Sequence, residues 1–105
     1  MSVLYTMKWN TPNQKEEEYT AWAKKTIPRI LGAPGLVEFR AYRAAAASHY
    51  ILVIFEIESK EAFSKFWEFL QREKLLEETY ANTVDAVSEL WGPSPLVPKP
   101  LRPKR

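Results

Sequence analysis

The sequence has no cysteine, a single histidine and only three glycines among its 105 residues. Without cysteine the chain has no disulfide framework, thiolate metal site or thiol nucleophile, and this composition fits a cytoplasmic protein. No second histidine or carboxylate stands at ligand spacing from the lone imidazole, so we expect no metal site. No glycine-rich phosphate loop is present, and we expect no cofactor.

Long apolar runs are also missing. No stretch approaches the roughly 20 residues that a membrane-spanning helix needs. The first five residues enter a strand-like pattern at once, without the charged and apolar regions of a signal peptide. We therefore expect a soluble cytoplasmic protein with no membrane partner.

Acidic residues are absent from the last 13 positions. The formal net charge is +2, but Lys99, Arg102, Lys104 and Arg105 lie in this segment, so the other 92 residues carry 11 basic and 13 acidic groups, or −2. These 92 residues, the body of the chain, are slightly acidic and would repel the phosphates of a nucleic acid. We therefore expect no nucleic-acid partner.

The same segment holds five of the eight prolines. We divide the chain into one domain, residues 1–92, and a basic proline-rich tail, residues 93–105, that runs extended. This tail either wraps a dimer partner or stays disordered, although its composition also suits a docking peptide for an aromatic groove.

The whole chain is rich in large apolar side chains, with 46% hydrophobic and 13% aromatic residues. Period-two alternation predicts strands over residues 3–10 and 36–43, and a nearly continuous apolar run predicts a central strand over residues 50–57. Residues 81–91 supply a last strand. Two helical stripes separate them, one starting at a Thr11-Pro12 cap and interrupted by Pro28, the other capped by Ser59.

This order, β-α-β-β-α-β, predicts an α+β ferredoxin-like fold with a four-stranded antiparallel sheet. Right-handed crossovers place both helices on one face of the sheet and leave the other face bare. Too few residues remain in the chain to cover that face. We therefore expect a homodimer whose two sheets close into a dimeric α+β barrel.

Two segments carry a resemblance to a known family. They are Pro34-Gly35-Leu36-Val37-Glu38-Phe39-Arg40-Ala41-Tyr42-Arg43 and Ile51-Leu52-Val53-Ile54-Phe55-Glu56-Ile57-Glu58-Ser59-Lys60-Glu61-Ala62-Phe63. The chain resembles the antibiotic-biosynthesis-monooxygenase-like group of dimeric α+β barrel proteins over residues 3–91. The resemblance implies a homodimer with a pocket in each subunit between the helices and the sheet.

That group includes cofactor-independent oxygenases of phenols and quinones, and haem-degrading oxygenases. The haem degraders use a histidine in or after the second helix, a strand asparagine and a tryptophan. Residues 69–78 contain no histidine, and Asn10 matches the strand asparagine only loosely. The phenol oxygenases place Trp, Tyr and Asn groups around a flat substrate, and these residue types are present without a diagnostic spacing.

Trp22 and Trp67 lie on the inward stripes of the two helices. We expect them to form opposite walls of a flat apolar pocket that takes a small aromatic ligand, with Asn10 as a further binding residue. The alternative is ordinary core packing.

His49 is the candidate base, because its unperturbed pKa lies near neutrality; the alternative is a solvated or interface histidine. Arg40 and Tyr42 share a strand face and are candidates to orient an oxyanion and to donate to a carbonyl. Cross-strand ion pairing is the alternative for Arg40.

The predicted function is binding of a flat, largely apolar small molecule, with cofactor-independent monooxygenation of a phenol or quinone as the chemistry. A non-enzymatic small-molecule or partner-binding dimer is the second hypothesis. A closed apolar space would favour the binding module, and an open pocket that contains Arg40, Tyr42 or His49 would favour an enzyme.

Overall fold

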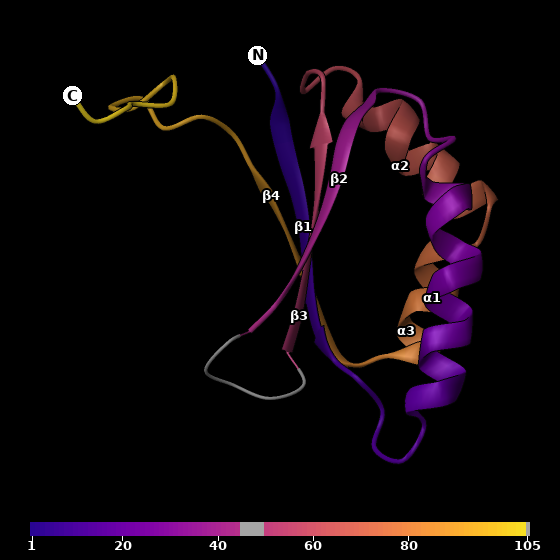
Figure 1. The fold of residues 1–105 in the computed structure, drawn as a ribbon. Helices are drawn as coiled ribbons and strands as arrows, with labels where there is room; N and C mark the ends of the chain where they lie inside the picture. Colours follow the sequence, from indigo (N-terminus) through magenta and orange to yellow (C-terminus); the bar gives the residue numbers. More distant parts are fainter. Residues whose placement is uncertain (45–49, 105) are drawn as a thin grey trace.

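The structure, a computed structural model, describes residues 1–44 and 50–104. One antiparallel sheet has the strand order β2-β3-β1-β4, and the helices cover one of its faces (Figure 1). In chain order the elements are β1 (Val3–Asn10), α1 (Glu16–Ile30), β2 (Leu36–Arg43), β3 (Tyr50–Ile57), α2 (Phe63–Arg72), α3 (Leu75–Asn82) and β4 (Val84–Trp91). The predicted ferredoxin-like α+β fold is confirmed.

The core lies between the sheet and the helices. The odd-numbered residues of β1 and β3 point toward the helices, because side chains alternate across a strand and the two strands pair Tyr5 with Phe55 and Met7 with Val53. Phe66 of α2 is fully buried against this surface, and its ring lies 5.4 Å from that of Phe55. Strands β1 and β3 are therefore the central strands on which the helices pack.

Helix α1 begins later than its sequence indicated and continues past Pro28. The expected cap at Thr11 is wrong: the helix starts at Glu16, where three consecutive glutamates occupy the first turn and favour the positive end of the helix dipole. The helix also passes through Pro28 to Ile30. Pro28 lacks an N–H and leaves the carbonyl of Lys24 without its helical donor, but it does not end the helix.

The second half of the helical layer contains a helix that the sequence interpretation missed. The expected cap at Ser59 lies one turn too early: its Oγ accepts the Ala62 N–H at 3.0 Å in the turn before α2, whereas the helix follows Ala62 without a side-chain cap. Lys74, with a left-handed φ of 58°, then separates α2 from α3. Helix α3 continues to Asn82, so the last strand begins at Val84 instead of Ala81.

Arg29 holds the helices of this layer together. Its guanidinium donates to both carboxylate oxygens of Glu78 on α3, at 2.7 and 3.1 Å, and to the carbonyl of Glu73 at 2.7 Å. The hydrogen bond from Arg29 holds the pKa of Glu78 below its ordinary value, and burial opposes this effect only in part. The ion pair therefore fixes α1 against the α2–α3 turn.

The opposite face of the sheet carries no helix among the described residues (Figure 1). Its side chains mix apolar and charged groups: Leu4, Thr6, Lys8, Glu38, Arg40, Tyr42, Leu52, Ile54, Glu56, Val87, Glu89 and Trp91. A shallow groove of about 360 Å³ runs between β1 and β4 on this face. We call it the open face.

Candidate functional site: an aromatic cavity between helix α1 and the sheet

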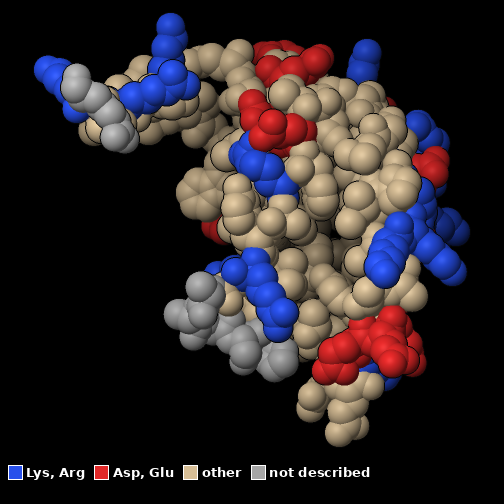
Figure 2. Space-filling view, viewed as in Figure 1, with Lys and Arg blue, Asp and Glu red and all other residues tan. Residues whose placement is uncertain are grey.

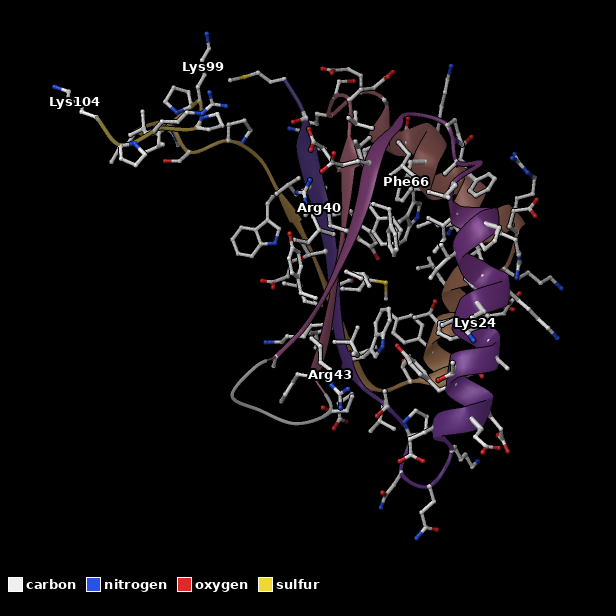
Figure 3. All side chains as sticks on the ribbon, viewed as in Figure 1. Lys24, Arg40, Arg43, Phe66, Lys99 and Lys104 are labelled. Atoms are coloured by element: carbon white, nitrogen blue, oxygen red, sulfur yellow. The ribbon has the colours of Figure 1, made fainter. Side chains whose placement is uncertain are left out.

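A small cavity lies between α1 and the helix-covered face of the sheet. Its volume is about 100 Å³, and Figure 2 looks toward the gap between the sheet and α1. The labels in Figure 3 place Lys24 on α1 and Arg43 at the end of β2, on either side of this gap. The lining residues are mostly apolar: Trp9, Tyr19, Trp22, Ala23, Thr26, Ile27, Ile30, Phe39, Ala41, Ile51 and Val53. We call this space the α1 cavity.

The cavity wall contains a hydrogen-bonded aromatic pair. The indole N–H of Trp9 donates to the hydroxyl oxygen of Tyr19 at 3.0 Å. Burial raises the pKa of Tyr19, and the hydrogen bond from Trp9 offsets this only in part. Tyr19 therefore stays protonated at neutral pH, and its own O–H remains available to donate to a ligand.

Two further polar groups of the wall lack hydrogen-bond partners within the described residues. Thr26 is only 4% exposed, and its hydroxyl makes no hydrogen bond. The indole nitrogen of Trp22 is also buried without a partner; it is close enough to Glu78 to help lower the pKa of that carboxyl, without hydrogen-bond geometry. Leaving a buried polar group unpaired is costly, so the Thr26 hydroxyl indicates a place for a guest with an acceptor or donor atom.

A second, larger hollow lies on the same face of the sheet, between α2 and the edge strand β4. It is an open groove of about 620 Å³, lined by Tyr5, Phe63, Ser64, Trp67, Glu68, Gln71, Ser88, Glu89 and Leu90. Tyr5 meets Trp67 edge-on at 5.8 Å between ring centres. We call it the α2–β4 groove, and it shares no lining residue with the α1 cavity.

Comparison with solved structures identifies this architecture. SnoaB, a cofactor-independent oxygenase from Streptomyces nogalater, superimposes with a TM-score of 0.66 over 93% of this chain and 98% of its own, at 16% sequence identity. A dimeric ferredoxin-like protein of unknown function from Thermobifida fusca gives 0.69 over 87% and 90%, at 10% identity. A proposed antibiotic biosynthesis monooxygenase from Bacteriodes thetaiotaomicron gives 0.64 over 98% and 96%, at 19% identity.

The chain has the fold of the antibiotic-biosynthesis-monooxygenase-like proteins. The resemblance inferred from the strand and turn segments is therefore confirmed at the level of fold. No protein-family model matches the sequence, and no curated protein matches it significantly. At these identities the likeness concerns the fold, and the chemistry must be argued from the side chains.

The structure separates the residues that the sequence placed in one pocket. Trp22 lines the α1 cavity, whereas Trp67 lines the α2–β4 groove. The prediction that they form opposite walls of one pocket is wrong, because α1 and α2 cover different parts of the sheet. Asn10 ends β1, on the opposite side of the strand from Trp9, and does not line either hollow.

Arg40 and Tyr42 lie outside both hollows. They point to the open face, opposite Ile54 and Leu52, so they do not lie beneath the helices. Arg40 forms ion pairs with Glu38 and, at 3.3 Å, with Glu56, and the Glu38 hydrogen bond raises its pKa. The cross-strand ion-pair alternative is thus the one observed. His49 lies outside the described residues, and its role as a base stays a prediction.

The sequence interpretation missed three polar groups of these hollows. Tyr19 and Thr26 are on the inward stripe of α1, and Tyr5 is on the inward face of β1. Thr26 gave a signal: it stands at helical spacing from Trp22 and Ile30 within an apolar stripe, where a hydroxyl is unexpected. Tyr5 could not be distinguished from an ordinary core residue, because its hydroxyl environment depends on α2.

Among the described residues, no three His, Cys, Asp or Glu side chains are grouped so as to hold a metal ion. No helix of the described chain is long and apolar enough to cross a membrane.

Proposed function

We propose that the α1 cavity binds a flat, largely apolar small molecule of about the size of one aromatic ring. The observation that carries the proposal is the aromatic cavity with an unpaired buried hydroxyl, that of Thr26. Ligand sites are concave, mostly apolar and equipped with a few polar groups that fix orientation. The α1 cavity has this character.

The cavity volume limits the size of the ligand. Its volume of about 100 Å³ compares with the engineered apolar cavity of about 150 Å³ that binds benzene. The α1 cavity is the smaller of the two, so a single-ring phenol or quinone requires a small outward movement of its wall, while haem and polycyclic compounds require a much larger opening. The rings of Trp9, Trp22 and Phe39 favour a planar guest through offset or edge-on contacts.

The polar groups favour a ligand with an oxygen atom. Tyr19 has a free O–H to donate, and Thr26 has a hydroxyl that both donates and accepts. A phenol hydroxyl or a quinone carbonyl would pair with them. We therefore expect the oxygen-bearing ligand to bind more tightly than the plain hydrocarbon of the same size.

Calorimetric titration with phenol, benzoquinone, benzene and haem tests this assignment. The variant Ala23→Leu should abolish binding because it fills the cavity, whereas Trp67→Phe, in the separate groove, should leave binding unchanged. The proposed site would be refuted if the two variants lost ligand affinity equally, or if no single-ring compound bound at millimolar concentration.

Cofactor-independent monooxygenation is a second candidate function, favoured by the fold that this chain shares with SnoaB. In its keto form a phenol has a ring CH₂ that can lose a proton, and the carbanion adds O₂ to form a peroxide. Loss of water then leaves a quinone carbonyl: CH₂ and O₂ become C=O and H₂O, and the carbon supplies the four electrons that O₂ takes up. The protein would need to orient, deprotonate and desolvate the substrate.

The described cavity wall contains no carboxylate or imidazole, so this candidate depends on a base from elsewhere, with His49 as the predicted one. Incubation with ¹⁸O₂ should place one labelled atom in the quinone and one in water, and His49→Gln should slow the reaction. Binding without any label incorporation would favour the non-enzymatic binding module.

We further propose that two copies pair through the open face. Tyr42, Val87 and Trp91 each expose about half of their surface there, and solved proteins with this fold include dimeric ferredoxin-like proteins. A closed barrel would cover this face and remove the unpaired sheet edges.

A further inference from the structure

The C-terminal tail combines exposed apolar side chains with positive charge. After Trp91 the chain runs through five prolines to its end, and no helix or strand is present in residues 92–104. Leu96 and Leu101 are 92% and 78% exposed. A segment that exposes two leucines and carries basic residues without any acid is suited to bind a surface that is both apolar and acidic.

The α2–β4 groove is such a surface. Tyr5, Phe63 and Trp67 form its aromatic floor, with ring centres 5.7 to 5.9 Å apart. Its charged side chain on the helix side is Glu68, and no lysine or arginine lines it. Glu89 borders the groove at the strand edge, but its side chain belongs to the open face, because Glu89 pairs with Thr6. Proline-rich segments bind in aromatic-lined grooves because their extended helix is already formed and costs little entropy to order.

Tyr5 supplies a donor for the backbone of such a segment. The residue is only 4% exposed, and its hydroxyl makes no hydrogen bond in the described structure. Burial raises the pKa of Tyr5, with a partial offset from nearby Ser88, so the hydroxyl stays protonated. A polyproline II chain has no internal hydrogen bonds, and its carbonyls are free to accept.

The path of the tail favours a groove on another molecule. In Figure 1 the tail leaves β4 on the side of the sheet away from the helices, whereas its own groove lies on the helix side. No tail residue lines that groove. Twelve extended residues reach about 35 Å at roughly 3 Å each, more than the 21 Å short dimension of the molecule. The tail is therefore long enough to pass the sheet of a facing copy.

We propose that the tail of one chain binds the α2–β4 groove of a second copy, with leucines and prolines on the aromatic floor and Lys99, Arg102 or Lys104 beside Glu68. Exchange of identical segments between protomers is a common route to dimers. The proposal presupposes the dimer and is independent of any ligand in the α1 cavity.

A labelled peptide of residues 93–105 tests the groove directly. The receptor is the full chain with K99E, R102E and K104E, whose own tail is repelled from the acidic rim. We expect saturable binding by fluorescence anisotropy that weakens with salt. Adding E68K should weaken it about threefold or more.

Trp22→Phe, in the α1 cavity, serves as the matched control and should leave peptide affinity unchanged, whereas Trp67→Ala should reduce it. No binding at millimolar peptide, or a peptide affinity that E68K leaves unchanged, overturns the groove assignment.

Sedimentation of the full chain tests the second copy. The tail variant and the E68K variant should each weaken the dimer, and a chain that carries all four charge changes should recover part of the loss. If none of these changes alters the dissociation constant of the dimer, the tail binds its own groove or no groove. That result contradicts the proposal even when the dimer itself is present.

Discussion

Thr26 has a buried hydroxyl on the inward stripe of α1 that makes no hydrogen bond in the described structure. Valine has nearly the same shape and no hydroxyl, so Thr26→Val should raise the free energy of unfolding by about 1 kcal/mol. The same change should weaken the binding of phenol in the α1 cavity, because the ligand loses a polar partner. Thermal unfolding with and without phenol measures both effects, and a lower melting temperature for the variant would show that the hydroxyl is paired in solution.

Glu78 makes stability depend on pH. Arg29 lowers the pKa of Glu78 in the folded chain, so the stabilisation is complete above the ordinary glutamate range and is lost as pH falls below about 4.5. Because the two side chains are 36% and 35% exposed, we expect no more than about 1 kcal/mol from the pair. Glu78→Gln should flatten the acid limb of the stability curve. An unchanged acid limb in urea unfolding at pH 3 to 7 would contradict this role.

The turn between α1 and β2 depends on one glycine. Gly35 has a φ of 78°, and a Cβ there would lie 3.1 Å from the Cβ of Ala62. Gly35→Ala should therefore lower the free energy of unfolding by about 1–2 kcal/mol, since only glycine adopts this conformation freely. Gly92→Ala is the control, because a Cβ at Gly92 meets nothing within 4 Å. Equal effects of the two substitutions in urea unfolding would contradict the argument.

At the level of elements, periodicity identified β1 because its alternate residues are buried, and a nearly continuous apolar run identified β3. Periodicity failed at α3, where polar side chains satisfy the local backbone: Thr79 donates to the Leu75 carbonyl at 2.7 Å and Thr83 to that of Thr79 at 2.6 Å. Such bonds do not create an apolar stripe. Pro28 allowed either a kink or an end of the regular helix, and the helix continues because it can lose one hydrogen bond near its end.

The candidate site was less predictable than the fold. Trp22 could be placed on an inward stripe from spacing alone, but which sheet residues it faces depends on where α1 crosses the sheet. The same geometry separates Trp22 from Trp67 and puts Arg40 on the open face. The sequence pattern within one helix or strand predicts which face of that element a residue occupies. Predicting a pocket also requires the relative positions of several helices and strands.

For the whole molecule, the open face predicts association. Val87 is 52% exposed there, and Val87→Asp should leave the fold intact but shift sedimentation at micromolar concentration from dimer toward monomer. Leu31→Asp is a matched control, since Leu31 is 62% exposed at the end of α1 on the helix side. If the unmodified chain sediments as a monomer, the barrel is not formed.

The central claim, a single-ring ligand in the α1 cavity, is tested most directly by following the indole N–H resonances of Trp9, Trp22, Trp67 and Trp91 in an NMR titration with phenol. Each resonance can be assigned from its Trp→Phe variant. Trp9 and Trp22 line the cavity, so their signals should shift along one saturable curve, while those of Trp67 and Trp91 stay in place. Shifts confined to Trp67 or Trp91, or no shift at millimolar phenol, would contradict the account.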